Sequence, residues 1–399
     1  MPNELLIPFG ICLSAFTVWL LAILSSVSMR HLGCLVEKAR KLPLKNDTND
    51  LPGISVIVVS HNQEAELQRN LPLILEQYYP NYEVIVVDIA STDGTKDLLE
   101  CLEQYYHNLR HTFTPQTSRD ISLSRLAITL GMKAAIHPWA LITQADCAPV
   151  SHSWLLHMAN ALNHHRSAEI VLGYTCYKGQ QYGKRKLQHF NLWQQILALP
   201  YAARHGAYRS GGENLLYSRA LFMQHMGFAS NANLLTGATD IMVNRNSTKD
   251  NTTICVHSEA VLERHITEEK RIWKQERFYF QETRIHFHRR HLYRLRYAWR
   301  VGIHMLNRIM LIASMAVGVY KGMNGQPKWY IATGVAVLLG IIHLIVQGLC
   351  YNHSAQLIDG RRQNFIRTSW YITLTPLWDF CAWLRHKFTS SQQFRKKYI

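Results

Sequence analysis

Residues 54–95 read ISVIVVSHNQEAELQRNLPLILEQYYPNYEVIVVDIASTDGT, and this stretch decides the fold. Two runs in it, 54–60 and 82–88, are short, apolar and rich in β-branched residues, which is typical of buried strands. A helical pattern covers 64–79 between them, and a turn at 91–95 provides an N-cap for the next helix. Alternating strands and helices predict a parallel sheet in an α/β domain.

A third strand is predicted at 139–143 (WALIT), after a helix around 126–135. It brings Asp146 to the carboxyl edge of the sheet, where open α/β sheets bind their ligands. The residues alone therefore predict a site for a nucleotide or another phosphorylated ligand at that edge.

Long uncharged or nearly uncharged runs lie toward both ends of the chain. Residues 5–29 and 329–351 contain no charged side chain, and 301–320 contains only Arg308. About 20 apolar residues cross a bilayer, so we expect three transmembrane helices, with Arg308 snorkelling to the interface. A signal peptide is the alternative for 5–29, but this run exceeds the usual core of roughly 7–15 residues and has no basic residue before it.

Basic residues beside these runs predict the orientation, because Lys and Arg favour the cytoplasmic ends of membrane helices. None lies in residues 1–4. Lys and Arg residues follow the first run at Arg30, Lys38, Arg40, Lys41 and Lys45. Others precede the second run at Arg289, Arg290, Arg294, Arg296 and Arg300, and follow the third at Arg361, Arg362 and Arg367. We expect a multi-pass protein of the cell membrane, with the N-terminus outside and the globular domain in the cytoplasm.

The formal net charge of +16 is compatible with nucleic-acid binding, but the basic residues gather beside the apolar runs. Anionic lipid head groups attract such clusters, so membrane lipids are the expected partner and nucleic acid is not. The eight cysteines form no Cys-Xaa-Xaa-Cys pair, which indicates neither a zinc site nor a disulfide framework.

The remaining segments complete the predicted organisation. Residues 30–53 form a basic juxtamembrane linker, and 54–300 form the cytoplasmic α/β domain. Residues 365–388 carry four Trp or Tyr side chains around Pro376, which favours an amphipathic helix at the membrane interface over a further span.

The strand, loop and turn pattern of 54–95 resembles the opening half of a family 2 glycosyltransferase. The resemblance continues through LITQADCAPVS (141–151), GGENLLYSRALF (211–222) and TGATDIMVN (236–244), and covers roughly 54–284. It implies a GT-A fold, a mixed α/β sheet, and transfer of a sugar from a nucleotide-sugar donor, usually with inversion. The membrane-associated branch of that family has similar flanking runs.

The resemblance assigns the donor site and a metal. Ser60, His61 and Asn62 stand where the family contacts the nucleotide, and Asp88 begins the second loop, with Ile89 in place of a second acid. A cap of the following turn is an equal interpretation of Asp88. Arg125 corresponds to a cation that reaches the diphosphate, or is a surface arginine.

The metal motif of the family, Asp-Ala-Asp, is here Gln144-Ala145-Asp146. Asp146 is the predicted charged ligand, with Gln144 a neutral oxygen ligand, and oxygen ligands suit Mg²⁺ or Mn²⁺.

The acceptor side departs further from the family. Ala238 and Thr239 replace acids, and the usual base position falls on Thr239, whose hydroxyl is no base near neutral pH. Asp240 is therefore the predicted catalytic base. Gln281 and Arg284 match a Gln-Xaa-Xaa-Arg motif that closes over the diphosphate, with Ile285 in place of the usual aromatic residue or histidine.

Two functions follow from this pattern. The first is a membrane glycosyltransferase that acts on a lipid-linked or cell-surface glycan precursor. The second is a catalytically inactive relative that binds a nucleotide sugar, a glycan or a partner, because acids are missing at Ile89, Gln144, Ala238 and Thr239. Release of nucleoside diphosphate separates the two.

Overall fold

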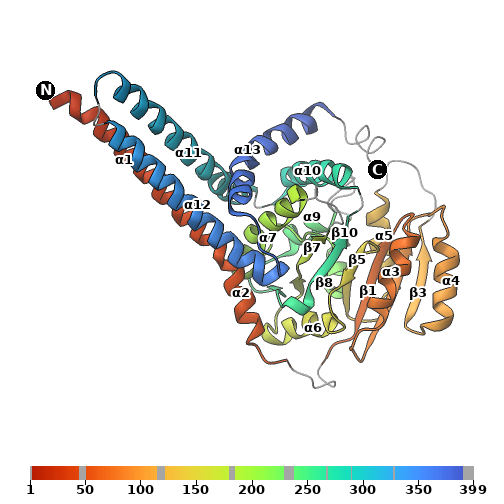
Figure 1. Cartoon of the computed structure of the whole chain (residues 1–399). Helices are drawn as coiled ribbons and strands as arrows, with labels where there is room; N and C mark the ends of the chain where they lie inside the picture. Colours follow the sequence, from red (N-terminus) through yellow and green to blue (C-terminus); the bar gives the residue numbers. More distant parts are fainter. Residues whose placement is uncertain are drawn as a thin grey trace. The chain divides into compact units, whose positions relative to one another are not determined.

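The computed structural model describes residues 2–44, 51–114, 122–178, 185–228, 238–266, 268–288, 290–326 and 329–389. The chain divides into two compact units (Figure 1). One comprises Met1–Cys34 and His291–Leu384, and the other comprises Leu35–Arg290 and Arg385–Ile399.

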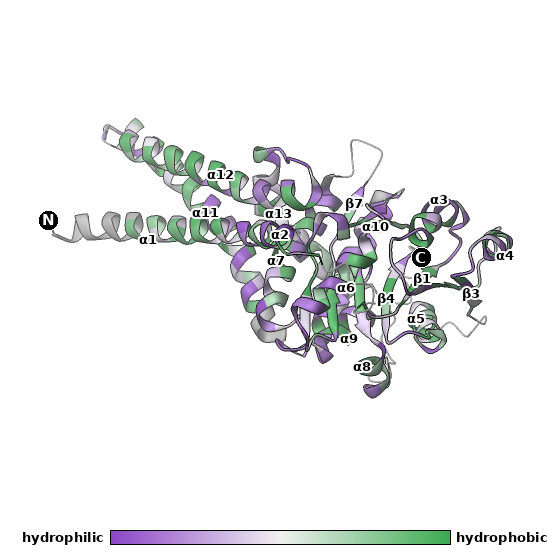
Figure 2. Cartoon of the chain, turned by 90° about the horizontal axis from the view of Figure 1, so that it is seen from below, coloured by the Kyte–Doolittle hydropathy of each residue, from purple (hydrophilic) through white to green (hydrophobic). Residues whose placement is uncertain are grey.

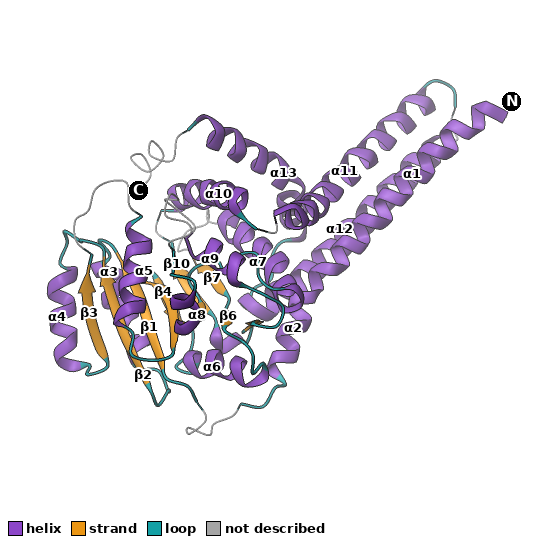
Figure 3. Ribbon diagram, turned by 180° about the vertical axis from the view of Figure 1, so that it is seen from behind, coloured by secondary structure: helices purple, strands orange, loops and turns teal. Residues whose placement is uncertain are grey.

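The second unit is built on a mixed seven-stranded sheet (Figure 3). Its strands are β1 (Ile54–Ser60), β2 (Tyr82–Asp88), β3 (Leu109–Phe113), β4 (Trp139–Gln144), β6 (Ile170–Leu172), β8 (Leu215–Ser218) and β9 (Thr252–Ile254). Their order is β3-β2-β1-β4-β8-β6-β9, and β8 runs antiparallel to both of its neighbours. The sequence predicted β1, β2 and β4 as parallel strands, and the bounds predicted for β1 and β2 are confirmed. Strand β3, which pairs with β2, was not predicted.

Helices cover this sheet. They are α3 (Glu64–Leu75), α4 (Thr95–Tyr105), α5 (Leu123–Ala134), α6 (Trp154–His164), α7 (Arg185–His205), α8 (Arg219–Gln224), α9 (Ala238–Asn246) and α10 (Glu269–His286), with a short 3-10 turn η4 (Ser258–Ala260). Helix α3 ends four residues before the predicted end, because the chain turns there and the backbone N–H of Gln77 donates to Tyr82 Oη at 3.1 Å.

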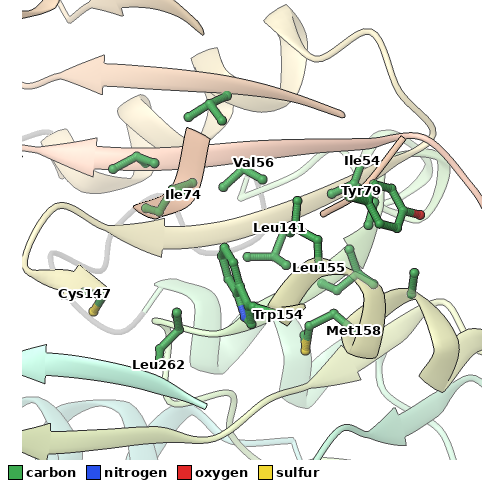
Figure 4. Close-up of a cluster of buried hydrophobic side chains, with 14 of the residues drawn as sticks. Ile54, Val56, Ile74, Tyr79, Leu141, Cys147, Trp154, Leu155, Met158 and Leu262 are labelled. Atoms are coloured by element: carbon green, nitrogen blue, oxygen red, sulfur yellow. The ribbon is translucent and has the colours of Figure 1, made fainter. Parts of the chain in front are cut away.

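The main core lies on one face of the sheet (Figure 4). Val56, on β1, points into it together with Leu141 of β4 and Trp154 of α6. Ile57 points to the opposite face, where α5 packs, since successive side chains of a strand alternate between faces. The helix comes so close there that a Cβ on Gly131 would lie 2.5 Å from Ile57 Cγ2. A glycine is therefore required at this crossing.

A second, three-stranded sheet has the order β5-β10-β7, from β5 (Cys147–Pro149), β7 (Thr175–Lys178) and β10 (Leu262–His265). Strand β10 runs antiparallel to β5, and their register places Arg264 opposite Cys147. This pairing brings residues more than a hundred positions apart to one end of the main sheet.

The first unit is helical. It contains α1 (Pro2–Val27), the 3-10 turn η1 (Ser28–Arg30), the start of α2 (His31–Arg40), α11 (Arg290–Met323), α12 (Trp329–Asp359) and most of α13 (Phe365–Phe388). Helices α1 and α12 lie side by side (Figures 1 and 3), and Trp19 Nε1 donates to the carbonyl oxygen of Leu339 at 2.9 Å.

Within the part of the chain that the structure describes, three helical segments are long and apolar enough to cross a membrane: Leu13–Arg40, Leu295–Met323 and Trp329–Asp359. The coloured part of α1, and most of α11 and α12, are accordingly hydrophobic in Figure 2. Two of the predicted domain boundaries differ from the helix boundaries in the structure. Part of the predicted linker 30–53 is helical as α2, and the predicted domain end at residue 300 falls inside α11, because one continuous helix joins the basic segment to the apolar one.

Candidate functional site

A cavity of about 340 Å³ opens at the carboxyl ends of the parallel strands. Strand register places Ser60 beside Asp88 and Val59 beside Gln144, so the polar ends of β1, β2 and β4 meet at this edge. The lining includes Ser60, His61, Gln63, Ile89, Ser122, Ser124, Gln144, Arg209, Gly211, Gly212, Glu213, Thr239, Asp240, Arg264, Gln275, Glu276, Tyr279 and Thr283. Four predicted site residues, Ser60, His61, Gln144 and Asp240, are among them.

Asn62 joins the two loops at this edge and Asp88 bonds within the second loop, but neither residue lines the cavity. The Asn62 backbone N–H donates to Ser91 Oγ at 2.8 Å, and Asn62 Oδ1 accepts from the Thr92 backbone N–H at 2.8 Å. Asp88 Oδ2 accepts from the Ser91 backbone N–H at 3.1 Å, and Asp88 Oδ1 accepts from Ser91 Oγ. Asp88 therefore caps the turn, which was the alternative interpretation of this residue.

Asp146, the predicted metal ligand, is buried beside the cavity and pairs with an arginine. Its Oδ2 accepts from Arg264 Nε at 2.7 Å, and its Oδ1 lies 3.5 Å from Cys147 Sγ. Gln144 reaches the cavity itself. The amide thus lines the cavity, whereas the carboxylate lies outside its lining and already contacts a guanidinium.

Arg264 is the centre of an acidic cluster. Besides Asp146, its Nη1 lies 2.9 Å from Glu213 Oε1 and 3.4 Å from Glu276 Oε1, and its guanidinium carbon lies 5.5 Å from the centre of the Tyr177 ring. Three carboxyl groups therefore surround one cation in a largely buried position. Such a group carries excess negative charge when all three acids are ionised, and a proton on one acid reduces this excess.

Glu213 is that acid. Burial raises its pKa to about 8 against the opposing effect of Arg264, and the charges of Glu276 and Asp146 add to the rise. Tyr177 Oη also donates to Glu213 Oε1 at 3.2 Å. At neutral pH the folded protein therefore carries a proton at Glu213, inside the cavity.

We expect Glu213→Gln to change how stability depends on pH. The folded protein keeps the Glu213 proton up to about pH 8, whereas an ordinary glutamate loses it near 4.5, so the wild-type free energy of unfolding falls as pH rises between these values. Glutamine cannot titrate, so the variant should gain stability relative to wild type from pH 5 to pH 8 in chemical unfolding of the detergent-purified protein. Exposed Glu100→Gln is the control, and parallel curves for wild type and Glu213→Gln would contradict the assignment.

Asp240 lies in the first turn of α9 and also reaches the cavity. Its Oδ1 accepts three hydrogen bonds, from Ser210 N at 2.7 Å, Ser210 Oγ at 3.0 Å and Gly211 N at 3.0 Å. Its Oδ2 lies 3.5 Å from Arg209 Nη2. Gly211 and Gly212 both have positive φ, of 81° and 84°, a conformation that side chains disfavour. Asp240 thus holds a glycine turn in place and presents its second oxygen toward Arg209.

Three predicted residues lie elsewhere. Arg125 is buried on α5, only 6% exposed, and neither lines the cavity nor lies on the surface. Gln281 is buried, and the Arg284 guanidinium lies 6.0 Å from the centre of the Phe280 ring. Gln281 and Arg284 do not line the cavity, because successive helix residues are rotated by about 100° and a different set of side chains faces it.

That set consists of Gln275, Glu276, Tyr279, Phe280 and Thr283 of α10. These five residues have the spacing of one helix face, and this spacing can be seen in the sequence. Assignment of any one of them to the cavity would therefore have identified the other four. Arg264 and Glu213 had no comparable signal, since Arg264 reaches Asp146 only through the pairing of β10 with β5.

A second group with metal-ligand chemistry lies apart from this cavity. His157, His257 and Glu259 bring their ligand atoms within 4.8 Å of one another. The two imidazole rings are stacked, with centres 3.8 Å apart and planes inclined by 13°. Stacked rings direct their nitrogen lone pairs in parallel, which does not suit a shared metal ion.

Comparisons with known proteins identify the domain that carries the cavity. Residues 55–226 match the family model described as glycosyl transferase family 2. They are a glycosyl transferase family 2 domain. The first two loops, Gln144, Glu213 and Asp146 all lie within this matched segment, while Asp240, Arg264 and α10 follow it.

Two curated relatives align with part of this family 2 domain. The putative teichuronic acid biosynthesis glycosyltransferase TuaG of Bacillus subtilis is 34% identical over 71 residues, 18% of this chain and 28% of that protein. Glycosyltransferase AglE of Haloferax volcanii is 30% identical over 110 residues, 27% of this chain and 34% of that protein. The chain thus spans about a third or less of these relatives' length.

The fold has a solved counterpart. The mannosyltransferase PcManGT from Pyrobaculum calidifontis, in complex with GDP-Man and Mn²⁺, aligns with 84% of this chain and 98% of its own, with a TM-score of 0.51 and 18% identity. The predicted GT-A architecture of the family 2 domain is confirmed by this likeness.

Proposed function

We propose that this chain is a membrane-bound, inverting glycosyltransferase that transfers a sugar from a nucleotide donor to a lipid-linked or cell-surface glycan precursor. The observation that carries the proposal is the cavity of the family 2 domain, where Ser60, His61, Gln144 and Asp240 meet at the carboxyl edge of a GT-A sheet. Nucleotide ligands bind at this edge of such sheets.

The donor is proposed to lie along this edge. Ser60 and His61 would contact the nucleoside, and the diphosphate would extend past Gln144 toward Arg209 and Arg264. His61 is held for this role, because its Nδ1 lies 2.6 Å from the carbonyl oxygen of Ile89. Asn62 and Asp88 would act indirectly, by keeping the two loops in position.

The charges of the site fit a divalent cation, Mg²⁺ or Mn²⁺. Two guanidinium groups, Arg209 and Arg264, face four carboxyl groups, and the raised pKa of Glu213 keeps a proton on that group near neutral pH. A donor diphosphate would add more negative charge, so a cation has to accompany it. Asp146 and Gln144, with Glu213 or Glu276, offer the oxygen ligands, and the cation would neutralise the departing nucleoside diphosphate.

Asp240 is the proposed base. The acceptor hydroxyl oxygen would form its bond to the anomeric carbon as the bond from that carbon to the phosphate oxygen breaks, and Asp240 Oδ2 would accept the hydroxyl proton. The three hydrogen bonds to Oδ1 orient the carboxylate, and the acceptor hydroxyl would approach Oδ2 beside Arg209 Nη2. A single displacement of this kind inverts the anomeric centre.

One observation favours the non-enzymatic alternative. The hydrogen bonds that Asp240 accepts from Ser210 and Gly211 suffice to explain its presence as a structural cap, and Ile89 and Thr239 supply no acid nearby. In that case the cavity binds a nucleotide sugar, a glycan or a partner protein without turnover.

The experiment that tests function and orientation together is donor hydrolysis in membrane vesicles. Cells that express the chain would give inverted and right-side-out vesicles, and each would receive a panel of nucleotide sugars with Mn²⁺. We expect release of nucleoside diphosphate from inverted vesicles only, because the positive-inside rule places the domain in the cytoplasm. Release from right-side-out vesicles would contradict the orientation. No release above that of vesicles lacking the chain, for any donor, would favour the binding role.

A further inference from the structure

Arg264 uses only part of its guanidinium group to hold the acids of the cavity. Its Nε donates to Asp146 Oδ2 at 2.7 Å, and the two N–H groups of its Nη1 face three acceptors. These are Glu213 Oε1 at 2.9 Å, Glu276 Oε1 at 3.4 Å and Tyr177 Oη at 3.4 Å. Among the residues that the structure describes, none accepts a hydrogen bond from Nη2. The guanidinium therefore keeps two N–H donors for a ligand.

Arg264 lines the cavity in which the nucleotide is proposed to bind, together with Gln144 and Arg209. A donor diphosphate in that cavity would bring phosphate oxygens to this guanidinium. Arginine binds phosphate well because its planar N–H donors match two oxygens at once. The diphosphate and the buried acids thus compete for the same side chain.

A divalent cation would compete with Arg264 for the acids. Asp146 and Glu213 are among the oxygen ligands proposed for the metal, and Arg264 contacts them at 2.7 Å and 2.9 Å. Two cations at the same carboxylate oxygens repel each other, and burial strengthens that repulsion. Arg264 and the metal therefore cannot both hold these acids.

Main-chain and tyrosine hydrogen bonds keep two of the acids in position without help from Arg264. The backbone N–H of His265 donates to the carbonyl oxygen of Asp146 at 3.0 Å, and Tyr177 Oη donates to Glu213 Oε1 at 3.2 Å. Arg264 itself lies on β10, the middle strand of the three-stranded sheet, which pairs with β5 and with β7. Because that backbone is paired on both sides, only the side chain of Arg264 is free to move between the acids and a ligand.

We propose that Arg264 couples metal binding to donor binding. Before the donor binds, its guanidinium occupies Asp146, Glu213 and Glu276; when the donor and a divalent cation bind together, the guanidinium moves to the diphosphate and the cation takes the acids. The proposal rests on the proposed function and describes how that site is regulated. It follows that donor and metal each bind more tightly when the other is present, and by the same factor.

The test compares what Arg264 contributes to nucleotide binding with and without the metal. The full chain in detergent micelles is titrated by calorimetry with UDP, GDP, dTDP and ADP, and the nucleotide that binds most tightly is kept. Each titration is run in EDTA and again with Mn²⁺ raised until the nucleotide affinity no longer changes. Chelation of Mn²⁺ by the nucleotide in solution is the same for every variant, so it cancels when variants are compared.

Arg264→Gln is expected to lower nucleotide affinity more in Mn²⁺ than in EDTA, with the two losses differing by about tenfold. In EDTA the acids retain the guanidinium, so its contribution to nucleotide binding is small. In Mn²⁺ the cation releases the guanidinium, and the variant then loses a full charge-assisted contact with the diphosphate.

Arg264→Lys is the second variant, because it keeps a positive charge among the buried acids and should fold even if Arg264→Gln does not. Its single ammonium lacks the paired donors of a guanidinium, so we expect the same direction with a smaller difference. Arg271→Gln, which replaces an exposed ion-paired arginine, is the control and should lose no affinity under either condition. Melting temperatures show which variants are folded.

Two patterns would overturn the proposal and leave the proposed function intact. Equal losses in EDTA and in Mn²⁺ would show that Arg264 stays on the acids in both states. A larger loss in EDTA would show that Arg264 replaces the metal and does not yield to it. If the wild type binds none of the nucleotides under either condition, the proposed function fails and this inference fails with it.

Discussion

Asp240→Asn is expected to lower turnover by roughly 100-fold or more while donor affinity stays nearly unchanged. Asparagine keeps an oxygen that can accept the hydrogen bonds of Ser210 and Gly211, so the glycine turn should persist. The amide cannot take a proton from the acceptor hydroxyl. The measurement is release of nucleoside diphosphate from saturating donor, together with donor affinity by calorimetry.

Asp97→Asn is the matched control, because Asp97 also lies in the first turn of a helix but is exposed and away from the cavity. Melting temperatures complete the comparison. If Asp240 is only a cap, its replacement should cost at most about 1 kcal/mol of stability and there is no turnover to lose. Robust hydrolysis that survives Asp240→Asn would refute Asp240 as the base.

Asp146→Asn and Arg264→Gln should shift metal affinity in opposite directions. Asp146 is the charged ligand of the motif, so its loss should weaken Mn²⁺-dependent nucleotide binding by about tenfold or more. Arg264 competes with a cation for the same carboxylates, at 2.7 Å from Asp146 and 2.9 Å from Glu213. Its removal should strengthen Mn²⁺ binding to a similar degree.

Arg264→Gln should also lower the free energy of unfolding by roughly 3–5 kcal/mol, because it leaves buried acids without their cation. Mn²⁺ should restore part of that stability, since binding to the folded state alone stabilises it. The measurements are Mn²⁺ titrations followed by calorimetry and by thermal unfolding, with Arg271→Gln, an exposed ion-paired residue of α10, as the control. Equal Mn²⁺ affinity in wild type, Asp146→Asn and Arg264→Gln would show that no metal binds among these acids.

Much of the fold was determined by local pattern. The apolar runs at 54–60 and 82–88 have the length and β-branched content of buried strands, and the structure has β1 and β2 at those bounds. The long apolar runs likewise predicted the helices of membrane-spanning length, because their hydrophobic composition is almost uninterrupted. Strand and helix periodicity and long apolar runs are properties of contiguous residues, so a sequence displays them directly.

Part of the site was also determined by sequence. Ser60, His61, Gln144 and Asp240 could be proposed because parallel strands end at one edge and because their motifs resemble those of a family 2 glycosyltransferase. The structure brings these four residues to one cavity. For Asp88 the sequence permitted two interpretations, and its hydrogen bonds to Ser91 are those of a turn cap.

Only the tertiary structure decided the electrostatic centre of the site. Arg264 meets Asp146 because β10 pairs with β5 across more than a hundred residues. Glu213 comes from a loop 51 residues before Arg264, and Glu276 comes from a helix 12 residues after it. The face of α10 that lines the cavity, and the burial of Gln281, depend on how that helix is rotated against its neighbours. Long-range strand pairing and helix rotation are set by packing between distant segments, which leaves no mark in the local order of residues.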